Sequence, residues 1–176
     1  MWMIVPLLIL ALVLSIIYWS IRNGISPMPS TRKQAKAMIS LLPSPIQGRI
    51  ADLGSGWGTL AIALAQQLPE CRITGYENSP IPLYASKLIA RIARLSNLEL
   101  IRADLLSISL SDFQAIVCYL HPAAMRKLQT KLEVELPAGT PIICNTFAMA
   151  GWKPEEVIRL DDLYHTQIYF YRMQHF

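Results

Sequence analysis

Hydrophobic positions follow two different patterns along the chain. The first 21 residues contain no Asp, Glu, Lys, Arg or His, so a helix over them would be apolar on nearly every face. After residue 48, short apolar runs of strand length alternate with longer stretches in which apolar positions recur at helical spacing. Alternating strands and helices predict an α/β fold in which helices cover both faces of a mostly parallel sheet.

The second pattern resolves into individual elements. We expect seven strands, over residues 49–53, 72–77, 98–103, 115–120, 140–147, 156–159 and 165–172. We expect four helices, one that Ser30 or Thr31 caps and that extends to Leu42, and others over 58–68, 80–95 and 122–136. No helical pattern separates the last two strands, so they should pair through a turn near Asp161 and Asp162 as an antiparallel edge.

The apolar N-terminal segment has the length of a membrane-spanning helix. A helix of roughly 20 apolar residues crosses a bilayer core, and Trp2 at one end with Tyr18 and Trp19 at the other are typical of interfacial anchors. A cleaved signal peptide is one alternative, although no basic start precedes the segment and no small-residue cleavage site clearly follows it. A buried core helix is another, which the lack of a polar face disfavours. We expect residues 1–22 to be one uncleaved transmembrane helix.

Basic residues gather directly after this segment. Five of them precede the first acidic residue, Asp52: Arg22, Arg32, Lys33, Lys36 and Arg49. The positive-inside rule therefore predicts a single-pass membrane protein whose remaining chain is cytoplasmic, at the inner membrane if the source is bacterial. From residue 50 onward there are eleven basic and twelve acidic residues. Anionic lipid headgroups thus explain the basic residues better than nucleic acid does, and ordinary solvated surface charge is the alternative.

The cysteines and histidines do not have the spacing of metal ligands. Cys71, Cys118 and Cys144 are far apart in the sequence and form no C-x-x-C-type pair. Two of them lie in apolar, strand-like runs. We expect buried, reduced thiols, and no metal site.

A glycine-rich loop stands between the first expected strand and its helix. Asp52 precedes Gly54, Gly56 and Gly58 in D-L-G-S-G-W-G. Ligands of parallel sheets bind beyond the carboxyl ends of the strands, glycine lets the backbone approach a ligand closely, and a helix N-terminus offers free amides. A dinucleotide-binding loop would place its third glycine one residue later, so the spacing favours another nucleotide-like ligand.

Two more carboxylates follow the next two expected strands. Glu77 ends one and Asp104 follows the other, and a carboxylate at the position of Glu77 can accept hydrogen bonds from both hydroxyls of a ribose. The alternative is that each acid only caps a helix or a turn. Three acids at three successive strand ends favour the binding role.

The loop resembles motif I of class I S-adenosylmethionine (SAM) methyltransferases. Further stretches, between residues 27 and 154, are P-M-P-S-T-R-K-Q-A-K-A-M-I, D-L-G-S-G, G-Y-E-N-S-P, A-D-L, M-R-K-L-Q-T-K-L-E-V-E-L-P-A-G-T-P-I-I-C-N-T-F and G-W-K-P. Together they resemble the membrane-anchored lysine methyltransferases that include the ATP synthase c-subunit and adenine nucleotide translocase enzymes. This resemblance covers most of the chain. It implies a Rossmann-like class I fold with a transmembrane helix over 1–22, a basic, proline-containing linker and lead-in helix over 23–48, and a SAM-dependent methyltransferase domain over 49–176.

The resemblance also implies roles for particular residues. The cofactor-binding set is Asp52, Gly54, Ser55, Gly56, Gly58, Glu77, Asn78, Asp104 and Leu105. Trp152 and Pro154 would shape the acceptor pocket, and Pro29 and Ser30 would cover the cofactor. The alternatives are a packed aromatic residue in a loop and a linker with a helix cap. The family usually has an acidic residue in place of Trp57 and an arginine in place of Thr59.

Tyr119 and His121 lie at the end of the fourth expected strand, where a methyl acceptor would approach. A lysine, with a reference pKa of about 10.4, must lose a proton before it attacks a methyl group, and a desolvated pocket lowers that pKa. In-line positioning then supplies much of the rate. We expect Tyr119 or His121 to orient the amine. The alternative is a histidine that only turns the loop before Pro122.

These observations predict a membrane-tethered SAM-dependent protein-lysine methyltransferase that acts on a membrane-embedded protein. Tethering would raise the local concentration of such a substrate. Two alternatives are a methyltransferase of a lipid or quinone-like small molecule and a non-catalytic SAM-binding scaffold. The N/D-P-P-Y/F motif of enzymes that methylate nucleobase amino groups or glutamine is absent from the sequence, and no nucleic-acid partner is expected.

Overall fold

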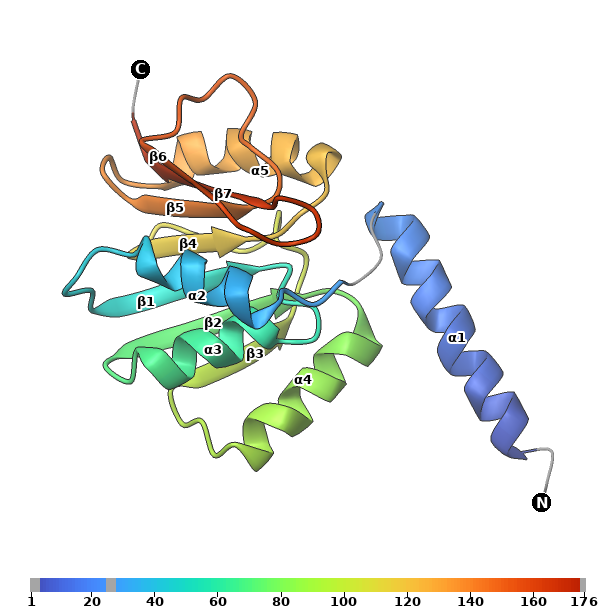
Figure 1. Ribbon diagram of the computed structural model, residues 1–176. Helices are drawn as coiled ribbons and strands as arrows, with labels where there is room; N and C mark the ends of the chain where they lie inside the picture. Colours follow the sequence, from blue (N-terminus) through green and yellow to red (C-terminus); the bar gives the residue numbers. More distant parts are fainter. Residues whose placement is uncertain (1–3, 25–27, 175–176) are drawn as a thin grey trace.

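The computed structural model describes residues 4–24 and 28–174 and contains a seven-stranded sheet covered by helices, with one helix projecting from it (Figure 1). The helices are α1 (Ile4–Asn23), α2 (Arg32–Ser40), α3 (Thr59–Gln67), α4 (Pro80–Ile92) and α5 (Pro122–Glu135). The strands are β1 (Gly48–Leu53), β2 (Cys71–Glu77), β3 (Leu98–Arg102), β4 (Ala115–Cys118), β5 (Pro141–Asn145), β6 (Glu156–Arg159) and β7 (Gln167–Arg172). The predicted elements of the α/β domain are therefore all present.

The strand order is β3-β2-β1-β4-β5-β7-β6. The first five strands are mutually parallel, and β7 pairs antiparallel with both β5 and β6. The predicted antiparallel edge is confirmed. The chain runs outward from β1 to β3 and then returns to β4 on the other side of β1, so the topological switch point lies between β1 and β4. Ligands of open α/β sheets bind at such a point, beyond the carboxyl ends of the strands.

Each face of the sheet has its own hydrophobic core. On one face α2, α3 and α4 pack on the strands through buried residues such as Met38, Leu64 and Leu83. On the other face α5 packs through Leu128 and Leu132, together with the segment that connects β3 to β4. All three cysteines are buried and free.

Five element boundaries differ from the sequence prediction by two or three residues: the ends of β4, β5, α4 and α2, which stops at Ser40, and the start of β7 at Gln167. β4 and β5 end at Cys118 and Asn145, two residues early, because Cys118 pairs with Cys144 at the last step of the β4–β5 ladder. Beyond β5, Thr146 has a left-handed φ of 66°. α4 ends at Ile92 because Arg94 is also left-handed, with φ 53°, and Leu95 N–H turns back to the carbonyl of Ala90.

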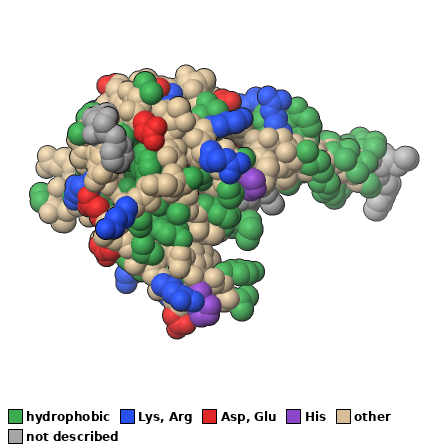
Figure 2. All heavy atoms as spheres, turned by 90° about the horizontal axis from the view of Figure 1, so that it is seen from above, with side chains coloured by type: hydrophobic (Ala, Val, Ile, Leu, Met, Phe, Trp, Pro, Cys, Tyr) green, Lys and Arg blue, Asp and Glu red, His purple; other side chains and the backbone are tan. Residues whose placement is uncertain are grey.

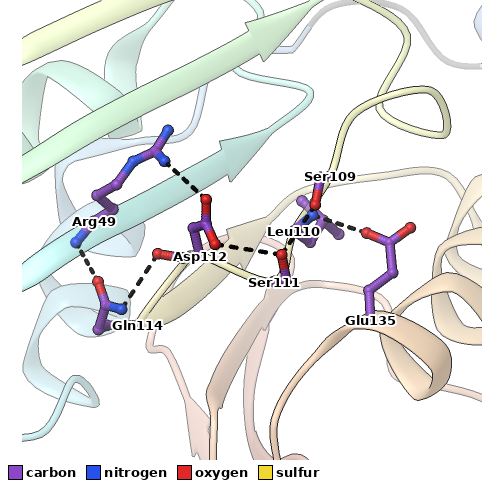
Figure 3. A network of polar contacts seen from close by, with 7 residues as sticks. All are labelled: Arg49, Ser109, Leu110, Ser111, Asp112, Gln114 and Glu135. Atoms are coloured by element: carbon purple, nitrogen blue, oxygen red, sulfur yellow. Dashed lines mark hydrogen bonds and ion pairs between the residues drawn. The ribbon is translucent and has the colours of Figure 1, made fainter.

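Polar side chains join three elements at the amino end of the sheet (Figure 3). The Arg49 backbone N–H donates to Gln114 Oε1 at 2.6 Å, and Gln114 Nε2 donates to the carbonyl of Asp112 at 3.2 Å. The Arg49 guanidinium lies 3.7 Å from Asp112 Oδ2. Leu110 N–H donates to Glu135 Oε2 on α5 at 2.8 Å. These contacts fix the segment between β3 and β4 against β1 and α5.

α1 has none of its residues buried, and it extends from the body of the protein as a mostly hydrophobic projection (Figure 2). Among the described residues it is the one helix long and apolar enough to cross a membrane, by length and composition. A signal sequence near the N-terminus passes the same test. Trp2, the expected interfacial anchor, and residues 25–27 of the expected proline-containing linker lie outside the described residues.

Candidate functional site

A cavity of about 380 Å³ opens at the carboxyl ends of β1 to β4, at the switch point of the sheet. Its walls come from residues within 21–24, 28–30, 52–60, 76–79, 103–106 and 119–127. Segments far apart in the chain thus converge at the place where ligands of this fold bind.

Most of the residues expected at a site line this cavity. They are Pro29, Ser30, Asp52, Gly54, Ser55, Gly56, Glu77, Asn78, Asp104, Leu105, Tyr119 and His121. Within the described chain, Gly58, Trp152 and Pro154 are not part of the lining, and neither is Trp57.

The glycine loop after β1 turns sharply beneath the cavity. Gly54 has a φ of 77°, and a Cβ there would lie 2.5 Å from a side-chain carbon of Leu120. The backbone N–H groups of Gly54 and Ser55 both donate to the carbonyl of Tyr76, at 2.9 Å each. The loop is therefore held against β2, and only glycine fits at position 54 without displacing its neighbours.

Gly58 serves the packing of two helices. It is the N-cap of α3, with a φ of 77°, and a Cβ there would lie 2.6 Å from Cβ of Ser86 on α4. Its lack of a side chain allows this close approach.

Two buried polar atoms of the lining residues have no hydrogen-bond partner among the described residues. They are Oδ2 of Asp52 and Oγ of Ser55. Unpaired buried polar atoms are rare in folded proteins, because each costs free energy. A polar ligand in the cavity would satisfy them.

Burial changes the acidity of Asp52. The residue is 2% exposed, and its desolvation raises the pKa to about 7. The Ala61 backbone N–H acts in the opposite direction and lowers this pKa, and the neighbouring Glu77 charge raises it further. A cation bound nearby would stabilise the ionised form of Asp52.

Glu77 connects the loops that follow β1 and β2. Its Oε2 accepts from the Gly56 backbone N–H at 2.9 Å, and its Oε1 accepts from the Ser79 backbone N–H at 2.7 Å. The side chain is buried and lines the cavity. Backbone donors thus hold this carboxylate in one position at the end of β2.

Asp104 is exposed and holds the turn after β3. Its Oδ1 accepts from Leu106 N–H at 2.9 Å, and its backbone carbonyl accepts from both Ser107 N–H and Ser107 Oγ. The expected carboxylates of β1, β2 and β3 therefore line one cavity.

Tyr119 and His121 lie on the β4 side of the cavity. The Tyr119 ring stacks on Phe147, with centroids 6.3 Å apart. His121 is the N-cap of α5, and its Nδ1 accepts from Ala123 N–H at 3.2 Å. With Nδ1 used as an acceptor, Nε2 carries the proton of the neutral ring and can donate. His121 thus both caps α5 and lines the cavity.

The C-terminal end of α1 forms one wall of the cavity. Asn23 and Asn78 exchange side-chain amide hydrogen bonds at 2.9 and 3.0 Å, and Asn23 Nδ2 also donates to Ser79 Oγ at 3.0 Å. A Cβ at Gly24 would lie 3.4 Å from Nδ1 of His121. The apolar helix is therefore joined to the residues that directly follow Glu77.

α2 begins beside the cavity, next to Ser30. Thr31 and Gln34 form a capping box, in which Thr31 Oγ1 accepts from Gln34 N–H at 3.2 Å and Gln34 Oε1 accepts from Thr31 N–H at 2.9 Å. Of the two candidates for the cap, Thr31 is the one used. Gln34 Nε2 donates to Thr166 Oγ1 and Asn145 Nδ2 donates to Gln34 Oε1, so α2 is fixed to the sheet.

Trp152 packs away from the cavity. Its ring makes an edge contact with Tyr171, with centroids 5.9 Å apart, and its Nε1 donates to Glu133 Oε1 at 3.1 Å. Trp57 is half-buried. Among the described residues, no group of three or more His, Cys, Asp or Glu side chains is placed to hold a metal ion.

Several lining residues were not expected from the sequence. Asn23 lies in N-G-I-S-P, which has the composition of a turn, and its partner Asn78 is 55 positions away. Arg22 and Lys127 bring two cationic side chains to the lining. No local pattern marks these residues, because the tertiary fold alone brings them together.

A glycine loop, three strand-end carboxylates and a cavity at the switch point of a seven-stranded sheet define a class I methyltransferase fold. A family model, the ANTKMT methyltransferase domain, matches residues 52–156. The chain belongs to this methyltransferase family, and the resemblance expected from the sequence is confirmed.

Relatives and a solved structure agree with this assignment. The adenine nucleotide translocase lysine N-methyltransferase of Mus musculus is 31% identical over 130 residues, which are 73% of this chain and 56% of that protein. A protein-lysine N-methyltransferase of Saccharolobus islandicus is 25% identical over 147 residues, 82% of this chain and 91% of that protein. This chain thus spans about half the length of the mouse relative and most of the archaeal one.

The solved structure is an RNA methyltransferase from Salinibacter ruber in complex with S-adenosyl-L-homocysteine. It superposes on this protein with a TM-score of 0.74 and is 26% identical in sequence. The match covers 83% of this chain and 94% of that chain.

Proposed function

We propose that this protein is a SAM-dependent protein-lysine N-methyltransferase that α1 tethers to a membrane and that modifies a membrane protein. The observation that carries the proposal is the cavity in which carboxylates from the ends of β1, β2 and β3 converge, in a chain of the ANTKMT methyltransferase family. SAM carries a transferable methyl group on a cationic sulfonium.

The cavity suits each part of SAM. Glu77 would accept hydrogen bonds from the ribose hydroxyls, and Asp104 would accept one from the adenine amino group. Asp52 and Ser55 would face the charged methionine end of SAM. The unpaired Oδ2 of Asp52 and Oγ of Ser55 support this fit, because both atoms need a polar partner. Gly54 and Gly56 leave the loop without side chains that would fill the space.

The lining also suits a lysine acceptor. Arg22 and Lys127 belong to the cavity wall, and nearby positive charges disfavour the protonated form of an incoming amine. His121 Nε2 is a donor in the neutral ring and Tyr119 presents a hydroxyl, so both side chains would orient the acceptor without serving as strong bases. Holding the amine in line accounts for much of the expected acceleration.

The presence of α1 favours a substrate that lies in the membrane. If α1 spans a bilayer with the basic residues on the cytoplasmic side, the cavity at its C-terminal end lies close to the membrane surface. A membrane protein diffusing in the same bilayer then meets the cavity at a raised local concentration. The balance of eleven basic and twelve acidic residues from position 50 onward also favours a protein over a nucleic acid.

Incubation of the full-length protein with methyl-labelled SAM and membranes from its own source tests the proposal. We expect label in a protein band that hydrolyses to methyl-lysine, and none with a Glu77→Ala/Asp104→Ala variant. Label that organic solvent extracts would instead indicate a lipid or quinone-like acceptor. SAM binding in calorimetry without any transfer would indicate a scaffold, and a lack of SAM binding would overturn the proposal altogether.

A further inference from the structure

α4 has an outward face that is unusual for a water-soluble protein. The helix packs on the sheet side through Leu83, Ser86 and Ala90. The opposite face carries Tyr84, Leu88 and Ile92, spaced four residues apart and 62%, 60% and 73% exposed. A surface helix normally places charged residues there, and a continuous apolar stripe marks an interaction surface.

Basic residues run along one border of this stripe. Lys87, Arg91 and Arg94 are exposed. On the helix circumference Lys87 and Arg91 lie between the apolar stripe and the buried face, and Arg94 follows the C-cap residue of α4. The three side chains line an open surface depression at the C-terminal half of α4, to which Glu99 also contributes. An apolar stripe bordered by Lys and Arg is the pattern of a helix that lies in the interface of an anionic membrane.

The apolar stripe is continuous with α1. A small cleft between the two helices is lined by Ile16 and Trp19 of α1 and by Ile81 and Pro82 of α4. From this contact the two helices diverge (Figure 1). Lipid that surrounds α1 would therefore also reach the outward face of α4.

The junction has the composition of a membrane-water boundary. The guanidinium groups of Arg22 and Arg102 lie 5.5 and 5.8 Å from the centroid of the Trp19 ring. Tryptophan is enriched at headgroup level, and the two arginines at this level could contact headgroup phosphates.

We propose that α4 lies on the surface of the bilayer that α1 spans, with Tyr84, Leu88 and Ile92 inserted among the lipids and Lys87, Arg91 and Arg94 on anionic headgroups. This inference rests on the proposed tethering by α1. Two contacts, one spanning and one lying on the surface, fix the orientation of the domain, whereas α1 alone would let it rotate. The cavity would then face the membrane at a constant height.

Lipid quenching of a single probe tests the inference in the full-length protein. Because Cys71, Cys118 and Cys144 are all buried, a thiol-reactive fluorophore will label an introduced surface cysteine selectively. The probe is placed by Leu88→Cys on α4, and by Val134→Cys on α5 as a matched control, since Val134 is an apolar residue that is 79% exposed. The protein is reconstituted in vesicles that contain lipids brominated near the headgroup.

We expect the Leu88→Cys probe to lose most of its fluorescence and the Val134→Cys probe to lose little. Equal quenching at the two positions would overturn the inference. A dimer linked by a disulfide between the introduced thiols of two unlabelled Leu88→Cys chains, formed on air oxidation, together with no lipid quenching of the labelled protein, would also overturn it and assign the stripe to a second copy.

A third probe separates this inference from the tethering. A Leu10→Cys probe in α1 should be quenched by lipids brominated deep in the chains. If it is quenched and Leu88→Cys is not, α1 is a tether and only the α4 contact is wrong. If neither is quenched, the tethering itself has failed. Quenching at Leu88→Cys should also be stronger in vesicles with phosphatidylglycerol than in pure phosphatidylcholine. A Lys87→Gln/Arg91→Gln/Arg94→Gln variant should lose that difference, and its persistence would contradict the headgroup contact.

Discussion

The two ends of the sheet are built differently, although the same five parallel strands run between them. At the amino end, Arg49, Asp112 and Gln114 satisfy one another and close the segment before β4 onto β1 (Figure 3). At the carboxyl end, Asp52 Oδ2 and Ser55 Oγ are buried without partners among the described residues. Polar groups thus stabilise the fold at one end and are left available for a ligand at the other.

The largest expected effect comes from removing the charge of Glu77. Glu77→Gln should weaken SAM binding by at least about 30-fold, because a charge-assisted hydrogen bond contributes about 1.5–3 kcal/mol and glutamine keeps one uncharged oxygen to accept from the two ribose hydroxyls. Asp112→Asn, which removes a carboxylate at the amino end, is the control and should leave the affinity unchanged. Calorimetry with SAM measures both variants. Equal losses would show that the two ends do not differ in function.

A pH dependence should distinguish Asp52 from the paired carboxylates. Because its pKa in the ligand-free fold is about 7, SAM binding should weaken by up to about tenfold per unit as pH falls below 7, and level off above it. Asp52→Asn should remove this slope, so the difference between the two proteins across pH 5 to 8 isolates the contribution of Asp52. Parallel slopes would exclude Asp52 from the binding of the cationic ligand.

The same group should affect stability in the opposite direction. Its folded pKa exceeds its ordinary value of 3.8, so the unfolded chain releases this proton first. The contribution of Asp52 to the free energy of unfolding should therefore fall as pH rises from about 4 to about 7 and stay constant beyond. Denaturant titrations of wild type and Asp52→Asn at these pH values measure it, and the variant should be the more stable protein at pH 8.

Gly54→Ala should destabilise the glycine loop by about 2–4 kcal/mol. The left-handed φ costs roughly 1 kcal/mol for alanine, and the remainder comes from the clash of the new Cβ with Leu120. Gly139→Ala is a matched control, because Gly139 has a φ of 84° and nothing within 4 Å of its Cβ position. Thermal or denaturant unfolding compares the two. Equal destabilisation would mean that the loop yields to the added methyl group.

The smallest expected effect concerns the join between α1 and the cavity. Asn23→Ala removes the amide pair with Asn78 and should raise the Kd for SAM by about two- to fivefold. Each hydrogen bond contributes about 1 kcal/mol to stability, and only part of this free energy affects SAM binding. Ser20→Ala is the control on α1, since Ser20 Oγ donates only to the carbonyl of Ile16. An unchanged Kd in Asn23→Ala would show that the anchor and the site are independent.

Local patterns predict the elements of the domain because periodicity, glycine and proline act over a few residues. The seven strands, the antiparallel edge and the convergence of Asp52, Glu77 and Asp104 follow from such patterns. The ends of β4 and β5 do not, because a strand ends where its neighbour stops pairing, as Cys118 does at Cys144.

Residues whose roles depend on distant partners could not be predicted. Asn23 hydrogen-bonds to Asn78, and Gly58 lies so close to Ser86 on α4 that a side chain would not fit there. Neither contact can be seen in the sequence around Asn23 or Gly58. Trp152 stands in the G-W-K-P stretch of the resemblance, yet it packs on Tyr171 outside the cavity. A motif match identifies a position in the chain, whereas the direction of its side chain depends on the surrounding packing.

The most direct test of the proposed function is mass spectrometry of membrane proteins from cells with and without this protein. We expect Nζ-methylated lysine in at least one membrane protein of the wild-type cells. The modification should be lost on deletion, restored by the intact chain, and not restored by Glu77→Gln. Unchanged lysine methylation in the deletion strain, with a purified protein that binds SAM, would contradict the proposed function.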